Sequence, residues 1–209
     1  MIGKILKKKD LVIYESTVYP GCCEEICIPI IEKFSKLKLN KDFIFGYSPE
    51  RVNHGDRSNK INNINKIIIA PSTKGLKILQ KLYKSIIKSK LYLAPSIKVA
   101  ESAKLLENIQ RSINISLINE VTLILRKLKI DTHQVIEAAI TKWNFAKYTP
   151  GLVGGHCIAI DPYYLAYKAK KININTKLIL SGQKINQFIP IHIAKRVIKK
   201  ITNRGKKDV

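Results

Sequence analysis

The tract from residue 96 to 128 contains neither proline nor glycine, so it predicts one helix of roughly thirty residues. A helix of that length cannot be buried at both ends in a small domain, and it usually connects two domains or packs on a partner chain. Apolar residues recur along it at helical spacing, namely Ile109, Ile113, Leu117 and Ile124. We therefore expect this helix to pair with its counterpart in a homodimer.

Short apolar runs alternate with helical patterns on the N-terminal side of this tract. Pro29 lies inside the first helical pattern and should kink or split it. In the same pattern Ile26, Ile30 and Phe34 recur four apart, which predicts one apolar face. Alternating strands and helices are typical of a parallel α/β sheet. The expected strands cover residues 11–15, 42–47, 64–70 and 91–94, and the expected helices cover 22–37 and 73–87.

Helical patterns also follow the long tract. Asp131 should cap a helix over 131–139, and Pro190 should break a helix over 178–202. A further helix is expected over 162–172, after an irregular loop over 142–156. The second half of the chain is therefore predicted to be all-helical.

The charge of the chain raises the question of nucleic-acid binding. Lys and Arg number 38 against 15 Asp and Glu, which gives a formal net charge of +23. The basic residues are mostly lysines spread along the chain, whereas base readout relies on arginine. We expect no specific nucleic-acid partner, only nonspecific polyanion binding at low salt.

The apolar runs are too short for a membrane span, which needs ~20 residues, and the basic N-terminus lacks the apolar core of a signal peptide. We therefore expect no membrane partner and a cytoplasmic protein. Cys22, Cys23 and Cys27 lack the paired spacing of zinc ligands, so we expect them to pack in the core and expect no metal site.

The fourth cysteine, Cys157, lies in a glycine-rich loop before a predicted helix start. Asp161 followed by Pro162 reads as an N-cap and a first helical residue. The helix N-terminus favours a thiolate, so Cys157 is a candidate for covalent catalysis. In the alternative interpretation Asp161 is only a cap, Cys157 is a small buried residue and the glycines mark a turn. Those glycines, which allow backbone N–H groups to approach a ligand, are Gly151, Gly154 and Gly155.

Two further segments accompany this loop. The first reads Y-E-S-T-V-Y-P-G over residues 14–21 with G-Y-S-P-E-R over 46–51, and the second reads A-K-L-L-E-N-I-Q-R over 103–111. With these segments in this order, the chain resembles the UDP-glucose/GDP-mannose dehydrogenase family from about Leu11 to about Asn186. The segment over 141–145 is most similar to the branch that acts on UDP-N-acetylhexosamines, such as UDP-N-acetylglucosamine.

The resemblance implies a fold class and a reaction. The fold would be α/β, the remnant of a Rossmann-like parallel sheet (1–95), then an all-helical central domain with a long connecting helix (96–186), then a helical tail that starts a C-terminal domain (187–209). The reaction would be two successive NAD-dependent oxidations of a UDP-sugar at C6 to the uronic acid, which feeds surface polysaccharide synthesis. It would pass through a thiohemiacetal and a thioester on the cysteine.

The resemblance also implies roles for particular residues. Cys157 would be the nucleophile, Asp161 would assist its proton transfers, and Glu50 would act through water as acid and base. Lys104 and Asn108, four apart on one helix face, would hydrogen-bond the sugar's C6 oxygen and stabilise its charge. The remaining implied contacts are Thr17 to water or substrate, Pro150, Gly151, Gly154 and Gly155 to substrate, and Ser16, Thr17 and Glu50 to NAD.

The sequence departs from the family pattern at two points. It contains no Gly-x-Gly-x-x-Gly turn, and Thr149 stands where relatives of that branch carry arginine. We therefore expect a partial chain that lacks the N-terminal dinucleotide-binding half and the C-terminal domain, without measurable activity by itself. A noncatalytic remnant, a dimerisation module and a basic nucleic-acid-binding protein remain as alternatives.

Overall fold

The computed structural model describes residues 1–52 and 61–204. The chain packs as two compact units, Met1–Leu106 and Glu107–Val209, which are described separately. The division falls inside one long helix, and another helix runs across residue 186. The domain boundaries expected after residues 95 and 186 stay predictions.

The first unit contains two short parallel sheets. A bridge between Tyr47 and Ile69, antiparallel in direction, links the end of one sheet to the end of the other. The alternation of strands and helices predicted a parallel α/β fold, and the structure confirms it. The pairs are β1 (Leu11–Tyr14) with β2 (Ile44–Tyr47), and β3 (Lys66–Ile68) with β4 (Leu91–Leu93).

The helical tract after β1, which Pro29 was expected to kink or split, is continuous but changes from π to α geometry just before the proline. A π-helix, η1 (Cys23–Cys27), passes directly into α2 (Ile28–Ser35), with proline in the first turn of α2. The expected apolar face was wrong, because Ile28 and Ile31 are buried whereas Ile26, Ile30 and Phe34 are 42–55% exposed. A π-helix holds more residues per turn than an α-helix, so it shifts which positions face the core.

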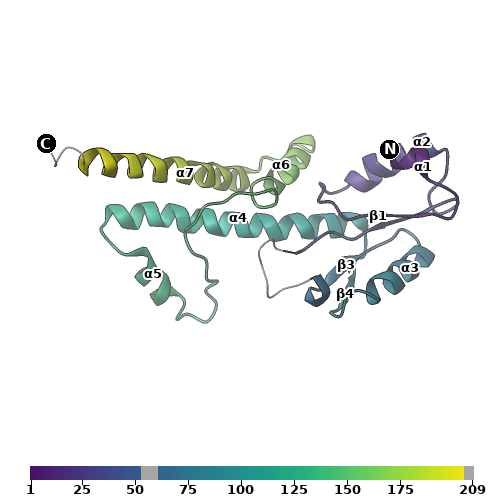
Figure 1. Ribbon diagram of the computed structural model, residues 1–209, viewed down its shortest axis with the longest axis horizontal. Helices are drawn as coiled ribbons and strands as arrows, with labels where there is room; N and C mark the ends of the chain where they lie inside the picture. The colour runs from purple at the N-terminus through teal and green to yellow at the C-terminus, as the bar shows by residue number, and fades with distance from the viewer. Residues whose placement is uncertain (53–60, 205–209) are drawn as a thin grey trace. The chain divides into compact units, whose positions relative to one another are not determined.

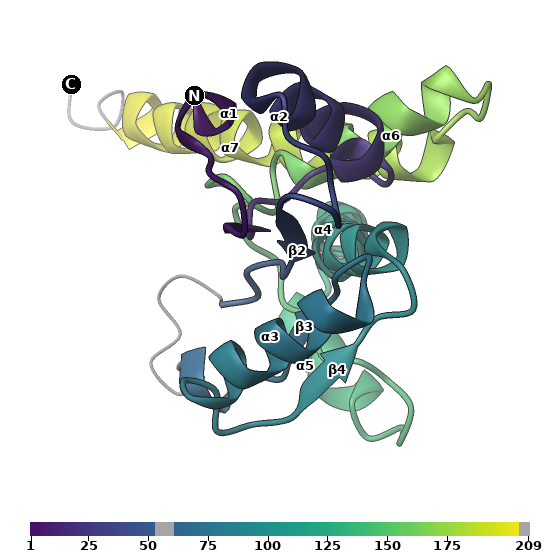
Figure 2. The same cartoon turned by 90° about the vertical axis from the view of Figure 1, so that its right-hand side faces the viewer.

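Three further helices belong to the first unit. They are α1 (Ile2–Ile5), the 3₁₀ turn η2 (Ile61–Asn63) and α3 (Thr73–Lys84). The N-cap of α3 is Ser72, whose side chain accepts a hydrogen bond from the Gly75 N–H at 3.1 Å. Figure 2 shows α3 beside β3 and β4. A side chain at Gly46 of β2 would lie 2.6 Å from Leu79, so glycine there permits the close packing of α3.

The second unit is helical. The long helix α4 (Ile97–Lys127) confirms the prediction from its proline-free sequence, and Asp131 caps α5 (Thr132–Ala139) as expected. After an irregular loop come α6 (Asp161–Lys171) and α7 (Lys177–Arg204). Figure 1 shows α7 running alongside α4, and a side chain at Gly182 of α7 would lie 2.6 Å from Ile113.

The break expected at Pro190 is wrong, because α7 continues through it. Proline removes one backbone hydrogen bond and strains one turn of a helix. Asn186 and Ile189, just before the proline, are buried, so packing holds the helix together across this turn. Among the helices of residues 1–52 and 61–204, none has the length and hydrophobicity that crossing a bilayer requires.

Candidate active site

The turn that carries Cys157 leads directly into α6. Cys157 is half-buried, and its carbonyl accepts the N–H groups of Ile160 at 3.3 Å and Asp161 at 2.9 Å. The cysteine therefore lies one turn before the helix, as the sequence predicts. The N-cap is Ile160, however, whose side chain makes no capping bond, and Asp161 is the first residue of the helix.

The carboxyl group of Asp161 is used for a different contact. It is buried at 3% exposure and accepts a hydrogen bond at 2.5 Å from the side-chain amide of Asn108, which is itself 4% exposed. The two residues are 53 positions apart and lie on α6 and α4. The structure thus brings together three of the predicted residues, Cys157, Asp161 and Asn108, and the interpretation of Asp161 as a simple cap is wrong.

The glycines of the loop leave its surface open. A side-chain carbon added at Gly151, Gly154 or Gly155 would contact nothing within 4 Å. Gly155 has φ of +76°, a conformation that other residues adopt only with strain. The Cα positions of these glycines therefore face open space, where a ligand can approach the backbone closely.

An amide network that the sequence interpretation missed holds this loop. The side chain of Asn119, 1% exposed, donates to the Gly151 carbonyl and accepts from the Gly151 N–H, both at 2.9 Å. Asn119 also donates to Asn186 of α7 at 3.2 Å, and Asn186 donates to the carbonyl of Ser112. Gln183 donates to the Ile158 carbonyl at 3.2 Å. The loop is thus fixed from α4 and α7.

A signal for this network was present in the sequence. Buried polar residues recur along α4 at spacings of three and four, which places them on one helix face. Polar residues that recur on one buried face of a helix indicate a set of hydrogen-bonding partners. Its members are Lys104, Asn108, Ser112, Ser116 and Asn119.

Lys104 belongs to the first unit and is 6% exposed. Within the part of the chain that the structure describes, no carboxylate forms an ion pair with it. A buried ammonium without such a partner is unusual, and it is well suited to an anionic or oxyanionic ligand.

Glu50 follows β2 in a predicted polar loop over 48–59, which the structure describes as far as Val52. One carboxylate oxygen, Oε1, accepts the N–H groups of Arg51 and Val52, both at 2.7 Å. The other, Oε2, lies 3.5 Å from the ammonium of Lys66. Burial raises the pKa of Glu50, but the two N–H bonds and the nearby Lys66 charge outweigh it, so the pKa lies below its ordinary value of 4.5. Glu50 is therefore ionised at neutral pH, so it can accept a proton and can donate one only after it has done so.

The predicted NAD contacts other than Glu50 lie in the segment after β1. Ser16 is exposed and Thr17 is half-buried, and the Ser16 carbonyl accepts the Tyr47 hydroxyl at 3.2 Å. In parallel α/β sheets ligands bind outside the carboxyl ends of the strands, which is where these residues lie. The residues present do not fit a whole dinucleotide, because no Gly-x-Gly-x-x-Gly phosphate turn occurs in the sequence.

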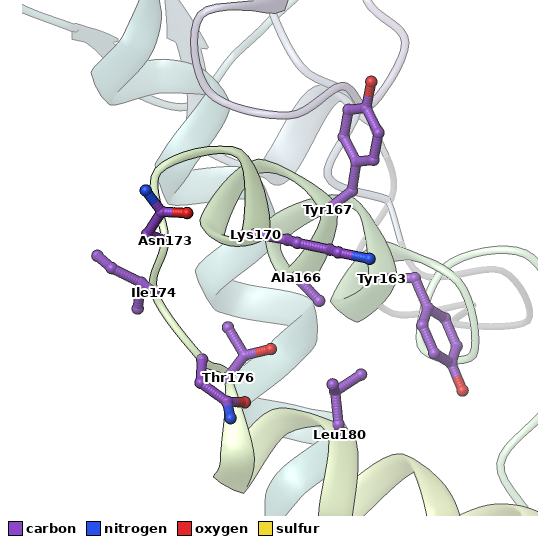
Figure 3. Close-up of a pocket in the computed structure, with 9 residues that line it drawn as sticks. Tyr163, Ala166, Tyr167, Lys170, Asn173, Ile174, Thr176 and Leu180 are labelled. Carbon is purple, nitrogen blue, oxygen red and sulfur yellow. The ribbon is translucent and has the colours of Figure 1, made fainter.

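A pocket of the second unit is lined by residues of α6 and the start of α7 and by none of the cysteine loop. Figure 3 shows it between α6 and the start of α7, with a volume of about 580 Å³. None of the predicted site residues lines it. Its lining includes Tyr163, Tyr167, Lys170, Asn173, Ile174 and Leu180.

A parallel α/β unit, a long helix that continues into a helical unit, and a cysteine loop beside a buried aspartate together define the nucleotide-sugar dehydrogenase class. Residues 1–87 match the NAD binding domain of the UDP-glucose/GDP-mannose dehydrogenase family, and residues 98–188 match its central domain. The chain belongs to the UDP-glucose/GDP-mannose dehydrogenase family, and the cofactor of the matched domain is NAD, as expected.

Similar proteins support this assignment. The chain is 48% identical over 203 residues to UDP-N-acetyl-D-glucosamine 6-dehydrogenase of Pseudomonas aeruginosa, covering 97% of this chain and 48% of that protein. It is 45% identical to the enzyme of that name from Salmonella typhi, covering 98% and 48%. The solved UDP-D-ManNAc dehydrogenase of Pyrococcus horikoshii superposes with a TM-score of 0.87 at 32% identity, covering 98% and 48%. The chain thus spans about half the length of the curated relatives that it matches.

Proposed function

We propose that this chain carries substrate-binding and thiol chemistry of a UDP-N-acetylhexosamine 6-dehydrogenase. The observation that carries the proposal is the arrangement of Cys157 one turn before α6, beside the buried Asp161 that Asn108 holds. The names of two relatives that are 45% and 48% identical to this chain, both UDP-N-acetyl-D-glucosamine 6-dehydrogenases, support this substrate class. We propose that the uronic acid product is made in the cytoplasm for surface polysaccharide synthesis.

The chemistry assigned to Cys157 needs a thiol and a place for its proton. Its sulfur adds to the carbonyl carbon of a C6 aldehyde, and the thiol proton passes to the carbonyl oxygen, which gives a thiohemiacetal. Asp161 accepts and returns that proton. After oxidation to the thioester, water attacks the acyl carbon and the cysteine leaves as a thiolate. A bound NAD, contacted by the residues proposed below, would supply the oxidising power for both steps.

The other predicted residues keep their proposed roles. Lys104 and Asn108 offer positive charge and an N–H group to an oxyanion at C6. Glu50 takes a proton through water, and Thr17 positions that water or the substrate. We propose Ser16, Thr17 and Glu50 as NAD contacts, and Pro150, Gly151, Gly154 and Gly155 as substrate contacts.

Protection of Cys157 from alkylation tests the proposal without requiring turnover. The purified chain is treated with iodoacetamide near neutral pH, with UDP-N-acetylglucosamine, UDP-glucose or UDP, and labelling is read by peptide mass mapping. We expect UDP-N-acetylglucosamine to slow labelling of Cys157 several-fold and more strongly than UDP-glucose or UDP does. Cys27, which is also half-buried, serves as the internal control and should not respond. Equal labelling of Cys157 with and without all three nucleotides in a folded chain would contradict the proposal.

We propose in addition that the protein is a homodimer paired through α4. The support comes from two of the four apolar residues expected to pair: Leu117 and Ile124, seven positions apart, are 53% and 55% exposed. Ile109, which was expected to pair as well, is buried at 6% exposure inside the chain. An exposed apolar stripe along a long helix is typical of a helix that packs on a second chain. This observation is also what favours the alternative of a noncatalytic dimerisation module.

A further inference from the structure

Lys66 lies at the centre of a charge cluster inside the first unit. It is the first residue of β3, and its side chain is 4% exposed. Its ammonium lies 3.2 Å from Oε1 of Glu15, which follows β1, and 3.5 Å from Oε2 of Glu50, which follows β2. It also lies 5.5 Å from the centre of the Tyr83 ring on α3. Four elements thus converge on one buried positive charge.

The two carboxylates of this cluster are held unequally. Oε1 of Glu15 accepts a hydrogen bond from the Tyr83 hydroxyl at 2.7 Å, and it lies closer to the Lys66 ammonium than Oε2 of Glu50 does. Oε2 of Glu50 has the longer contact with Lys66, since its Oε1 is already used by the N–H groups of Arg51 and Val52. Glu15 and Tyr83 therefore hold the ammonium in place. Oε2 of Glu50 is oriented by the ammonium and can still accept a further hydrogen bond.

Exposure separates the lysine from its partners. The side chains of Glu15 and Glu50 are 50% and 43% exposed, whereas Lys66 is almost fully enclosed. A buried ammonium behind two half-exposed carboxylates acts on them through a region of low dielectric, where its field is stronger than in water. The carboxylates themselves still face outward, where a ligand or water can reach them.

We propose that Lys66 is a positioning residue for Glu50: its ammonium stabilises the carboxylate charge and orients Oε2, the oxygen that accepts a proton. This inference rests on the proposed function, in which Glu50 is the proton acceptor. The lowered pKa of Glu50 agrees with it, because Lys66 is among the groups that lower that pKa. The other groups that face Glu50 are Glu15, the Tyr83 phenol and the neighbouring Arg51, whose guanidinium donates to the Asn65 carbonyl at 2.6 Å.

The test is a carbon-detected NMR titration of the Glu50 carboxyl in the free chain. Lys66→Met keeps the volume of the side chain and removes its charge, so we expect the Glu50 pKa to rise by about one pH unit. Lys66→Arg keeps the charge and should retain the low pKa. The control is Lys90→Met. The Lys90 side chain is exposed, and the backbone carbonyl of Lys90 accepts the backbone N–H of Lys66, so this substitution removes an equal charge from a neighbouring residue and should leave the Glu50 titration unchanged.

A lysine that only stabilises the fold would reduce the melting temperature without moving the Glu50 titration of the folded protein. An unchanged Glu50 pKa in folded Lys66→Met would therefore overturn the inference. If that variant does not fold, the double variant Glu15→Gln with Lys66→Met replaces it, because removing the Glu15 charge together with the ammonium leaves no second carboxylate to repel Glu50. The Glu50 pKa should then rise by the same amount relative to Glu15→Gln alone. Because the titration uses no nucleotide sugar, its outcome is independent of whether Cys157 is protected by UDP-N-acetylglucosamine.

Discussion

The four cysteines differ in their surroundings, and this difference decides which thiol reacts. Burial, with a hydrogen bond to Glu101, raises the pKa of Cys23 far above its ordinary value. Burial and the neighbouring Cys22 thiol raise the pKa of Cys27 to about 12. Cys22 is buried, whereas Cys157 is half-buried in an open glycine loop. Only the thiolate is nucleophilic, so enclosed thiols with raised pKa values react slowly.

We therefore predict that iodoacetamide near neutral pH labels Cys157 first. Because burial raises the pKa of Cys27, little of its reactive thiolate exists at neutral pH, so Cys157 should be labelled at least about ten times faster than Cys27. Peptide mass mapping over a time course measures the rates, and Cys157→Ser shows the background. Labelling of Cys22, Cys23 or Cys27 with Cys157 untouched would remove the central residue of the proposed chemistry.

At the scale of elements, the loop before α6 depends on contacts from α4 and α7. Asn119 forms hydrogen bonds with both the N–H and the carbonyl of Gly151. The two residues are 32 positions apart, so no local sequence pattern predicts this pairing. Local patterns do predict α4 and α5 with its Asp131 cap, because caps and helical spacing act within one or two turns. They fail at Pro190 and at the π-helix, where packing decides the outcome.

We predict that Asn119→Ala loosens the loop that carries Cys157. The substitution removes the two hydrogen bonds between Asn119 and Gly151, which lowers the free energy of unfolding by about 0.5–1.5 kcal/mol for each bond. Amide hydrogen exchange at Gly151 should accelerate and the melting temperature should fall. Asn114→Ala on the same helix is the control: Asn114 donates only to the carbonyl of Gln110 one turn earlier, so its loss should cost less than about 0.5 kcal/mol. Equal exchange at Gly151 in both variants would show that Asn119 does not hold the loop.

At the scale of the whole molecule, the exposed stripe on α4 gives a test of assembly. We predict that the wild-type chain sediments as a dimer at micromolar concentration. Leu117→Glu with Ile124→Glu should convert it into a folded monomer, because paired carboxylates in an apolar contact would be desolvated and would repel each other. Ile86→Glu, at a side chain 49% exposed in the first unit, controls for added surface charge. A well-folded wild-type monomer, or a double variant that still dimerises, would contradict pairing through α4.

The sequence by itself determined the long helix, the strand and helix alternation, the position of Cys157 one turn before a helix and the family resemblance. Each of these depends on residues close together in the chain or on motifs that need no partner. Tertiary structure alone decided that Asp161 turns from its own helix end toward Asn108, that Asn119 clamps Gly151, and that Glu15 and Tyr83, 68 positions apart, enclose Lys66. A buried polar group must find a partner wherever the fold brings one, and sequence spacing does not encode where that is.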